Sequence, residues 1–302
     1  MVRTDLGGYG SANRYVREKL NKLRSTDITF SALYGFMLSE EQNVLAKKTD
    51  DYKIIRKTYA ESRADTDANE CAFGEKYSSV TESLRNKFRA SPIVHVYVAR
   101  FPFPTDNEKI FPTARAEEID SCSNPEVKLE KYYVWKLLEN ALMRSLGLKL
   151  EKLDMRRSSC GKWECDGCCF SLSHSGNFVV VAVSGKPVGV DIEKSDEARF
   201  TAALAGKITT ARESEEILNL DERTRGRALN VLWTKKEAVF KLSGEKSFHP
   251  KNIETSDYAT VTKTFRCDEG QFLITVASDD AKYAVFRTGD NFEFIDFDIE
   301  KA

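Results

Sequence analysis

The chain has 302 residues, enough for one large domain or for two smaller domains that each bury an apolar core. It carries 46 Lys and Arg residues against 47 Asp and Glu residues, and this balance gives no whole-molecule reason to expect nucleic acid or an anionic membrane as a partner. No stretch approaches the roughly 20 apolar residues that span a bilayer, and the polar first residues lack the apolar centre of a secretory signal, so we expect a cytoplasmic protein.

Residues 1–90 are strongly charged and are helix-like in places. Apolar positions recur at three- and four-residue steps in NRYVREKLNKLR and in EEQNVLAKKTDDYKIIRKTYAES, but few bulky apolar residues separate the charges. We therefore predict a helical N-terminal extension over 1–90, with no residues that indicate chemistry.

The pattern changes after Ser91, where IVHVYVARF is an apolar run of strand length. The segment PEVKLEKYYVWKLLENALMRSLG follows, with apolar residues at helical spacing and Gly147 placed as a C-terminal stop. A folded core that begins with a strand and a long amphipathic helix is predicted.

Four of the seven cysteines lie close together after this helix: Cys160, Cys165, Cys168 and Cys169. The odd total and the two adjacent cysteines are not typical of a secreted disulfide framework. A structural zinc site is one interpretation of the cluster, but adjacent cysteines on a short turn point apart. The other interpretation is a loop of reduced cysteines that only pack.

The next segment, CFSLSHSGNFVVVAVSGKPVGVDIE, has three β-type runs separated by short turns. We expect the first two runs to pair as a hairpin, and the sequence does not decide whether the third extends that sheet or begins another. Further on, Thr210 and Glu213 form a capping-box pattern, a helix precedes Gly244, and three β runs follow over 271–278, 282–289 and 291–300.

Strand, helices and strands therefore occur twice along the chain. This order predicts an α+β fold with two pseudo-symmetric halves, 91–186 and 187–302, each a small antiparallel sheet packed on helices, joined to the N-terminal helical extension.

Asp191 and Glu193 are two carboxylates within the third β run. Alternate strand residues share a face, so these acids lie about 6 to 7 Å apart and repel each other unless one is protonated or a cation lies between them. The alternative is an edge strand whose acids face water. In the later helix, Trp233, Glu237 and Lys241 recur every four residues and lie along one side.

Three segments together resemble the 4′-phosphopantetheinyl transferase superfamily, in particular its two-half monomeric branch. They are Ser173-His174-Ser175, the strand Gly189–Glu193, and Trp233–Lys241, which matches W-x-x-K-E-(A/S)-x-x-K. The resemblance covers roughly 93–255, and 1–90 falls outside it. The family commonly has G-K-P before the S-H-S turn, where this chain has Gly161-Lys162-Trp163.

This resemblance implies Mg-dependent transfer of the 4′-phosphopantetheine arm from coenzyme A to a serine of an apo acyl or peptidyl carrier protein. Its implied Mg²⁺ ligands are Asp191, Glu193 and Glu237. Glu237 and Lys241 are the implied catalytic residues, with Glu237 or a metal-bound water as the base. The implied coenzyme A contacts are Lys162, Ser173, His174, Lys236 and Lys241.

Arg115, Lys128 and Lys131 are further candidates for the nucleotide end, and are equally well interpreted as solvated charges. The family also implies a monomer and an acidic carrier surface. Arg212, Arg223, Arg225 and Arg227 are candidates to contact that surface on charge alone. Two other interpretations stay open: a non-catalytic carrier- or nucleotide-binding homologue, and another Mg-dependent phosphoryl-transfer enzyme.

Overall fold

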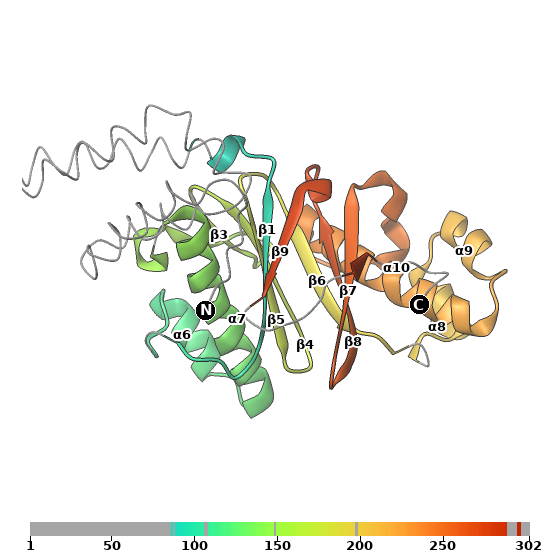
Figure 1. Ribbon diagram of the computed structural model, residues 1–302, viewed down its shortest axis with the longest axis horizontal. Coiled ribbons are helices and arrows are strands. Elements are labelled where there is room, and N and C mark those ends of the chain that lie inside the picture. The colour runs from blue at the N-terminus through green and yellow to red at the C-terminus, as the bar shows by residue number, and fades with distance from the viewer. Residues whose placement is uncertain are drawn as a thin grey trace, which may run out of the picture.

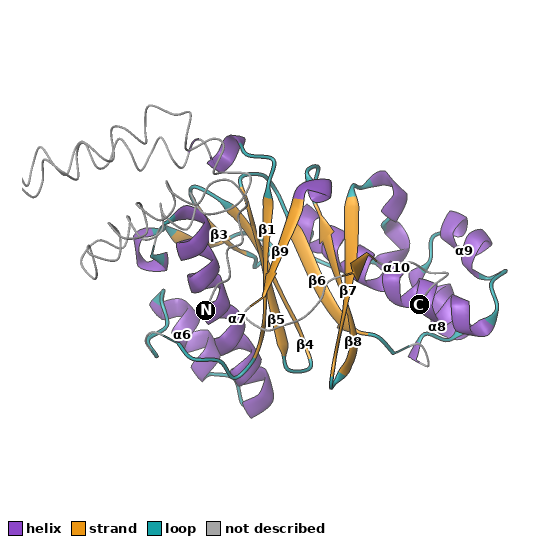
Figure 2. Ribbon diagram, viewed as in Figure 1, coloured by secondary structure: helices purple, strands orange, loops and turns teal. Residues whose placement is uncertain are grey.

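Two β-sheets lie face to face in the middle of the molecule, and helices cover their outer faces (Figures 1 and 2). The computed structural model describes residues 86, 88–105, 108–147, 149–196, 199–288 and 295–296. Helix α7, Pro125–Leu146, covers one sheet, and helix α10, Glu222–Ser243, covers the other. The predicted α+β fold class is confirmed.

The first sheet has the strand order β4-β5-β1-β9. Its strands are β1 at Val94–Arg100, β4 at Cys169–Ser175, β5 at Phe178–Ser184 and β9 at Ala284–Thr288. The predicted hairpin is confirmed, because β4 and β5 pair in antiparallel register. Alternate residues of β5 pack against α7 and against the second sheet, so this strand is buried on both faces.

The second sheet has the order β10-β7-β8-β6. Its strands are β6 at Gly189–Lys194, β7 at Thr260–Cys267, β8 at Gly270–Ala277 and β10 at Ile295–Asp296. The third β run, whose sheet the sequence left open, is β6, and it pairs with β8. Strand β7 was not predicted from the sequence.

Strand β9 follows the second sheet in the chain but completes the first, where it pairs in parallel with β1. A segment that falls in the predicted second half thus supplies an edge of the first sheet. The division at 186/187 stays a prediction. Of the predicted extension over 1–90, only residues 86 and 88–90 are described, so most of that prediction lies outside the described residues.

Helix α7 begins and ends as its sequence predicts. The Asn124 side chain accepts hydrogen bonds from the first backbone N–H groups, Pro125 occupies the first turn, and Gly147 ends the helix in the left-handed conformation with φ 74°. Its buried face packs on Tyr97 and Val181 of the first sheet. The helix is therefore fixed against β1 and β5.

Serines join the two sheets at their neighbouring edges. Three hydroxyls at alternate positions of β4 accept hydrogen bonds from alternate N–H groups of β6: Ser171 from Val190 at 3.0 Å, Ser173 from Ile192 at 3.4 Å, and Ser175 from Lys194 at 3.0 Å. These side chains satisfy donors that an unpaired strand edge would leave exposed. The S-L-S-H-S sequence thus holds β4 beside β6.

Helix α10 lies very close to β6 because Gly189 has no side chain. A Cβ at this position would lie 1.9 Å from the Ala238 carbonyl oxygen and 2.6 Å from the Leu242 backbone nitrogen. Asp221 caps the start of α10, and Gly244, at φ 68°, ends it. This close packing brings the side of the helix that carries Glu237 next to β6.

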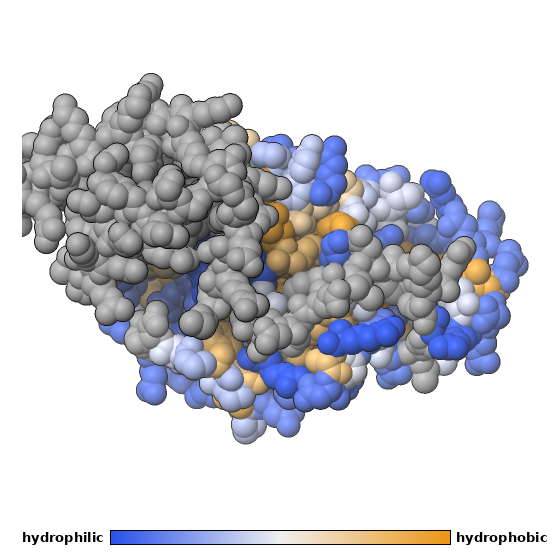
Figure 3. Space-filling view, viewed as in Figure 1, coloured by the Kyte–Doolittle hydropathy of each residue, from blue (hydrophilic) through white to orange (hydrophobic). Residues whose placement is uncertain are grey.

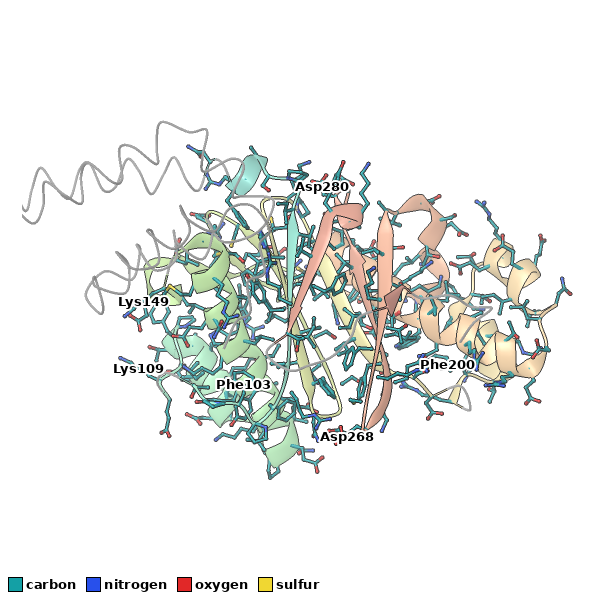
Figure 4. All side chains as sticks on the ribbon, viewed as in Figure 1. Phe103, Lys109, Lys149, Phe200, Asp268 and Asp280 are labelled. Carbon is teal, nitrogen blue, oxygen red and sulfur yellow. The ribbon has the colours of Figure 1, made fainter. Side chains whose placement is uncertain are left out.

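Smaller elements surround these layers: α6 at Thr113–Asp120, β2 at Met155–Arg157, β3 at Trp163–Cys165, α8 at Ala202–Ile208 and α9 at Ala211–Ile217. The predicted capping box is present, because Thr210 and Glu213 bond to each other's backbone N–H groups. Phe200 contributes to a separate apolar cluster at the α8 end of the molecule (Figure 4).

The face in Figure 3 is mostly hydrophilic over the α8 and α9 end, and apolar residues gather over its middle, where β7 and β9 lie. Within the described ranges, no helix combines the length and the apolar character needed to cross a membrane.

Candidate functional site

One side chain from each of the three sequence segments takes part in a contact at Asp191. The Asp191 side chain is 2% exposed and extends from β6 toward α10. Its Oδ1 accepts hydrogen bonds from Lys241 Nζ at 2.7 Å and from Ser173 Oγ at 2.8 Å. Its other oxygen, Oδ2, is buried and has no hydrogen-bond partner. A buried carboxylate oxygen without a donor is costly, so this position favours an added proton or cation.

Glu237 lies beside Asp191, one helical turn before Lys241. Burial, together with the nearby charge of Asp191, raises the pKa of Glu237 to about 7, although Lys241 acts in the opposite direction. Its Oε2 is 3.7 Å from Lys241 Nζ. Two carboxyl groups therefore share one ammonium group, and Glu237 gains or loses a proton near neutral pH.

Glu193 forms the outer part of the acidic cluster. Ser175 Oγ donates a hydrogen bond to its Oε2 at 3.3 Å, and Arg199 Nη1 lies 3.3 Å from its Oε1. Burial and then the Asp191 charge raise the pKa of Glu193. Arg199 also stacks over the Phe200 ring, so it binds Glu193 from the α8 side of the sheet.

The acidic cluster is Asp191, Glu193 and Glu237. Across the described part of the chain, no three His, Cys, Asp or Glu side chains are arranged closely enough to hold a metal ion as they stand. At this cluster, Lys241 provides positive charge to Asp191 and Arg199 provides it to Glu193. The donor chemistry still fits a hard cation, because carboxylate oxygens are what Mg²⁺ prefers and Asp191 Oδ2 is unpartnered.

Ser173 and His174 point to different sides of β4, as successive strand residues do. Ser173 Oγ contacts Lys241 Nζ at 2.8 Å and belongs to the acidic cluster. His174 Nδ1 instead lies 3.3 Å from Glu130 Oε2 of α7. Burial lowers the pKa of His174, and the Glu130 charge opposes this shift. The structure therefore separates the two members of the S-H-S turn.

Lys162 lies at a pocket beside the C-terminal end of α10. Its Nζ donates a hydrogen bond to the Lys241 carbonyl oxygen at 2.6 Å, and burial lowers its pKa. The pocket has a volume of about 270 Å³, and its lining includes three lysines, Lys162, Lys241 and Lys246, together with Trp163 and Phe240. It combines positive charge with aromatic surface, and it adjoins the acidic cluster through Lys241.

Lys236 was predicted to bind coenzyme A, and the structure does not bring it to the acidic cluster. Its side chain is fully buried, with Nζ 2.7 Å from Glu213 Oε2. It also donates to the backbone oxygens of Pro250, at 2.8 Å, and Ile253, at 2.5 Å. These three acceptors satisfy the ammonium group, which fastens α10 to the start of α9. The structure thus places Lys236 away from the acidic cluster, and its role in coenzyme A binding stays a prediction.

The three further candidates for the nucleotide end also have acidic partners. Arg115 and Lys131 both pair with Glu118, and Lys128 pairs with Asp120. Burial would raise the pKa of Glu118, but the bonds and charges of Arg115 and Arg157 hold it at about 2. These cations are thus largely neutralised within the protein.

Two contacts at the site were missed from the sequence. Ser175 binds Glu193 and was noted only as part of the S-H-S turn, although its two-residue spacing from Ser173 places both on one strand face. Arg199 also binds Glu193 and has no sequence signal, because it follows β6 in an irregular segment.

Known proteins resemble this chain over the segment that carries β6 and α10. The family model described as the 4'-phosphopantetheinyl transferase superfamily matches residues 187–288, which contain β6 and α10. Over this range the chain is similar to the 4′-phosphopantetheinyl transferase superfamily.

Among curated relatives, the chain is 38% identical over 76 residues to 4'-phosphopantetheinyl transferase psf-1 of Bacillus pumilus. That match covers 25% of this chain and 32% of the relative. It is 27% identical over 161 residues to 4'-phosphopantetheinyl transferase Sfp of Bacillus subtilis (strain 168), covering 51% of this chain and 70% of the relative. Similarity to these family members is thus concentrated in part of the chain, and the match with psf-1 spans about a third of that protein.

Proposed function

We propose that the protein is an enzyme that transfers the 4′-phosphopantetheine arm of coenzyme A to a serine of an apo acyl or peptidyl carrier protein. The observation that carries the proposal is the junction of β6 and α10. There, a buried Asp191 with one unpartnered oxygen lies beside Glu237, whose pKa is about 7, and beside Lys241. The names of the family relatives support the same activity.

In this proposal Asp191, Glu193 and Glu237 would hold Mg²⁺. The ion would supply positive charge that neutralises oxygens of the diphosphate group. Lys241 would have to leave Asp191 Oδ1 for a second cation to bind there, and its flexible side chain and exposure of 24% allow that movement. The freed ammonium group would then lie at the edge of the site, where it can neutralise the diphosphate.

Glu237 is the group that we propose accepts the serine proton. Burial and the Asp191 charge raise the pKa of Glu237 to about 7, which makes it a stronger base than an exposed carboxylate, and bound Mg²⁺ would act against this effect. Asp191 would keep Glu237 basic through its charge, and burial would exclude water that competes with the serine.

The pocket beside Lys162 is where we propose that the phosphates of coenzyme A enter the site. Lys162 and Lys246 provide point charges for phosphate, and Trp163 and Phe240 provide apolar surface. Ser173 would contact the substrate from β4 next to Lys241. His174 would contribute only from its side of β4, near Glu130.

The carrier protein is proposed to bind with an acidic surface. The four arginines predicted for this role are placed on α9 and the first half of α10, at the hydrophilic end of the molecule (Figure 3). Their roles, the monomeric state and the cytoplasmic location remain predictions.

The test is a transfer assay with fluorescently labelled coenzyme A, a panel of apo carrier proteins and Mg²⁺, compared with the same mixture containing a chelator. We expect Mg-dependent labelling of at least one carrier, loss of that labelling in Asp191→Ala and in Glu237→Gln, and unchanged far-UV circular dichroism. Binding of coenzyme A without transfer to any carrier would favour a non-catalytic homologue. Cleavage of coenzyme A without a carrier would favour another phosphoryl-transfer reaction.

A further inference from the structure

Cys165 and Cys168 form a close thiol pair outside the candidate site. Cys165 ends β3, Cys168 precedes β4, and the turn Asp166-Gly167 joins them, with Gly167 at φ 109°. Their sulfur atoms are 3.4 Å apart, and the residues are only 8% and 7% exposed. The pair is thus held in contact by a two-residue hairpin turn.

The neighbouring cysteines do not belong to this pair. Cys160 Sγ lies 2.9 Å from Ser158 Oγ at the preceding turn. Cys169 directly follows Cys168 and begins β4, and successive residues of an extended chain point to opposite faces. The structure, over the residues that it describes, contains no cluster of three such ligands that could hold a metal ion. Of the two interpretations left open by the sequence, zinc is therefore not supported, and one pair of thiols stands apart from the others.

The backbone of the pair is compatible with a disulfide. Cys165 and Cys168 form an antiparallel β-bridge, and opposite residues in such a ladder have Cα atoms about 4.5 to 5.5 Å apart. This range falls within the roughly 4.4 to 6.8 Å found for disulfides. The sulfur atoms need to approach by about 1.4 Å to reach the usual S–S length of about 2.0 Å.

The two thiols are also chemically unequal. The hydrogen bond from Cys168 lowers the pKa of Cys165, whereas the same contact together with burial raises the pKa of Cys168. A hydrogen bond between the two thiols favours the thiolate on the accepting sulfur, so one member of the pair is suited to be the attacking sulfur.

We propose that Cys165 and Cys168 are a peroxide-sensitive dithiol that closes reversibly to a disulfide. The Cys165 thiolate attacks one oxygen of hydrogen peroxide, and the O–O bond breaks to give a sulfenic acid, with hydroxide leaving as water after it takes a proton. The Cys168 thiol then attacks the Cys165 sulfur, and a second water leaves. Overall, two thiols are oxidised and one peroxide is reduced to two waters.

The position of this cross-link connects it to the pocket. Strand β3, before the turn, begins with Trp163 next to Lys162, and strand β4, after the turn, contains Ser171. All three residues line the pocket beside Lys162. A disulfide at the turn would link β3 and β4, which form two walls of the pocket, at the end where the turn joins them. Peroxide therefore oxidises two residues of the hairpin that lines the pocket, Cys165 and Cys168, and leaves the residues of the acidic cluster unmodified.

The test uses the full chain, reduced, freed of reductant and treated with a small molar excess of hydrogen peroxide. The expected result is the loss of two of the seven thiols, recovered by dithiothreitol. In mass spectrometry, the tryptic peptide that begins at Trp163 should be lighter by two hydrogen atoms. It should give no backbone fragments from within the loop closed by residues 165 and 168. Fragments from cleavage between Cys168 and Cys169 should remain, because that bond lies outside the loop.

Matched variants separate the pair from its neighbour. Cys165→Ser and Cys168→Ser should abolish this disulfide, whereas Cys169→Ser should leave it unchanged. A disulfide that includes Cys169, equal thiol loss in all three variants, or oxidation to sulfinic acid without a disulfide would each overturn the proposal. Peptide mapping of the wild-type chain decides the matter even if a variant does not fold.

Discussion

Replacing Gly189 with alanine tests whether close packing of α10 on β6 builds the site. The added methyl carbon would lie 1.9 Å from the Ala238 carbonyl oxygen, and real Cβ contacts essentially never fall below 3.0 Å. The obstructing atoms are backbone, which no side-chain rotation can move. Helix and strand must therefore separate locally by about 1.1 Å, the difference between these two distances.

Two consequences of this separation can be measured. Overpacking of this kind costs about 1 to 3 kcal/mol of unfolding free energy, which corresponds to a fall in melting temperature of roughly 4 to 8 °C for a loss of about 2 kcal/mol. Misplacing catalytic groups by about 1 Å lowers the rate by roughly a hundredfold. We expect both effects in Gly189→Ala, measured by thermal unfolding and by the transfer assay.

The matched control is Gly206→Ala. Gly206 lies in α8, and a Cβ there would have no heavy atom within 4 Å. The same added methyl group should leave activity unchanged and stabilise the protein slightly, because alanine favours a helix by up to about 1 kcal/mol. If Gly189→Ala melted within about 1 °C of the wild type and kept its activity, tight packing at this position could not be what places Glu237.

The remaining predictions concern charged and titratable groups. Burial, and secondly the Arg287 charge, lower the pKa of His95 from 6.5 to about 3, so the unfolded chain binds the proton more strongly. The contribution of neutral His95 to the unfolding free energy should therefore be complete above pH 6.5. Below that pH, the unfolding free energy should fall by up to about 1.4 kcal/mol per pH unit until pH 3. Urea titrations of His95→Gln at several pH values should show a smaller fall. Lys236→Met should lower the unfolding free energy by about 3 to 5 kcal/mol because it leaves the buried Glu213 without this cation. Weaker coenzyme A binding at unchanged stability would instead support a direct role of Lys236 in binding. Arg199→Gln should tighten the binding of a divalent cation by up to about fivefold, because the ion pair from Arg199 to Glu193 is worth at most about 1 kcal/mol. Calorimetry measures this change. Weaker binding would show that Arg199 does not compete with the cation.

Local sequence signals predicted the long elements well. The end of α7 at Gly147, the capping box at Thr210 and the end of α10 at Gly244 each depend on one or two neighbouring residues, and the structure confirms all three. Such signals act within a few residues, so one sequence is enough to see them.

Pairing between distant segments could not be predicted in the same way. Strand β7 has the sequence TVTKTFRC, whose threonines and lysine give no continuous apolar run, and it is held by pairing with β8. The sheet to which β6 belongs, and the return of β9 to β1, depend on tertiary contacts. Propensity does not encode these choices.

The same limit applies to the candidate site. Strand alternation placed Asp191 and Glu193 together, and four-residue spacing placed Glu237 and Lys241 together. Lys236 precedes Glu237 by one residue, which turns its side chain about 100° around the helix, toward α9. Only the position of α9 shows that this direction leads into the protein.

The return of β9 to the first sheet has a consequence for synthesis of the protein. Val94 pairs with Ala284, so a growing chain on the ribosome carries one open edge of its first sheet until nearly all of the described fold has been made. An open strand edge readily pairs with other chains. Truncation before residue 284 would therefore make this protein prone to aggregate.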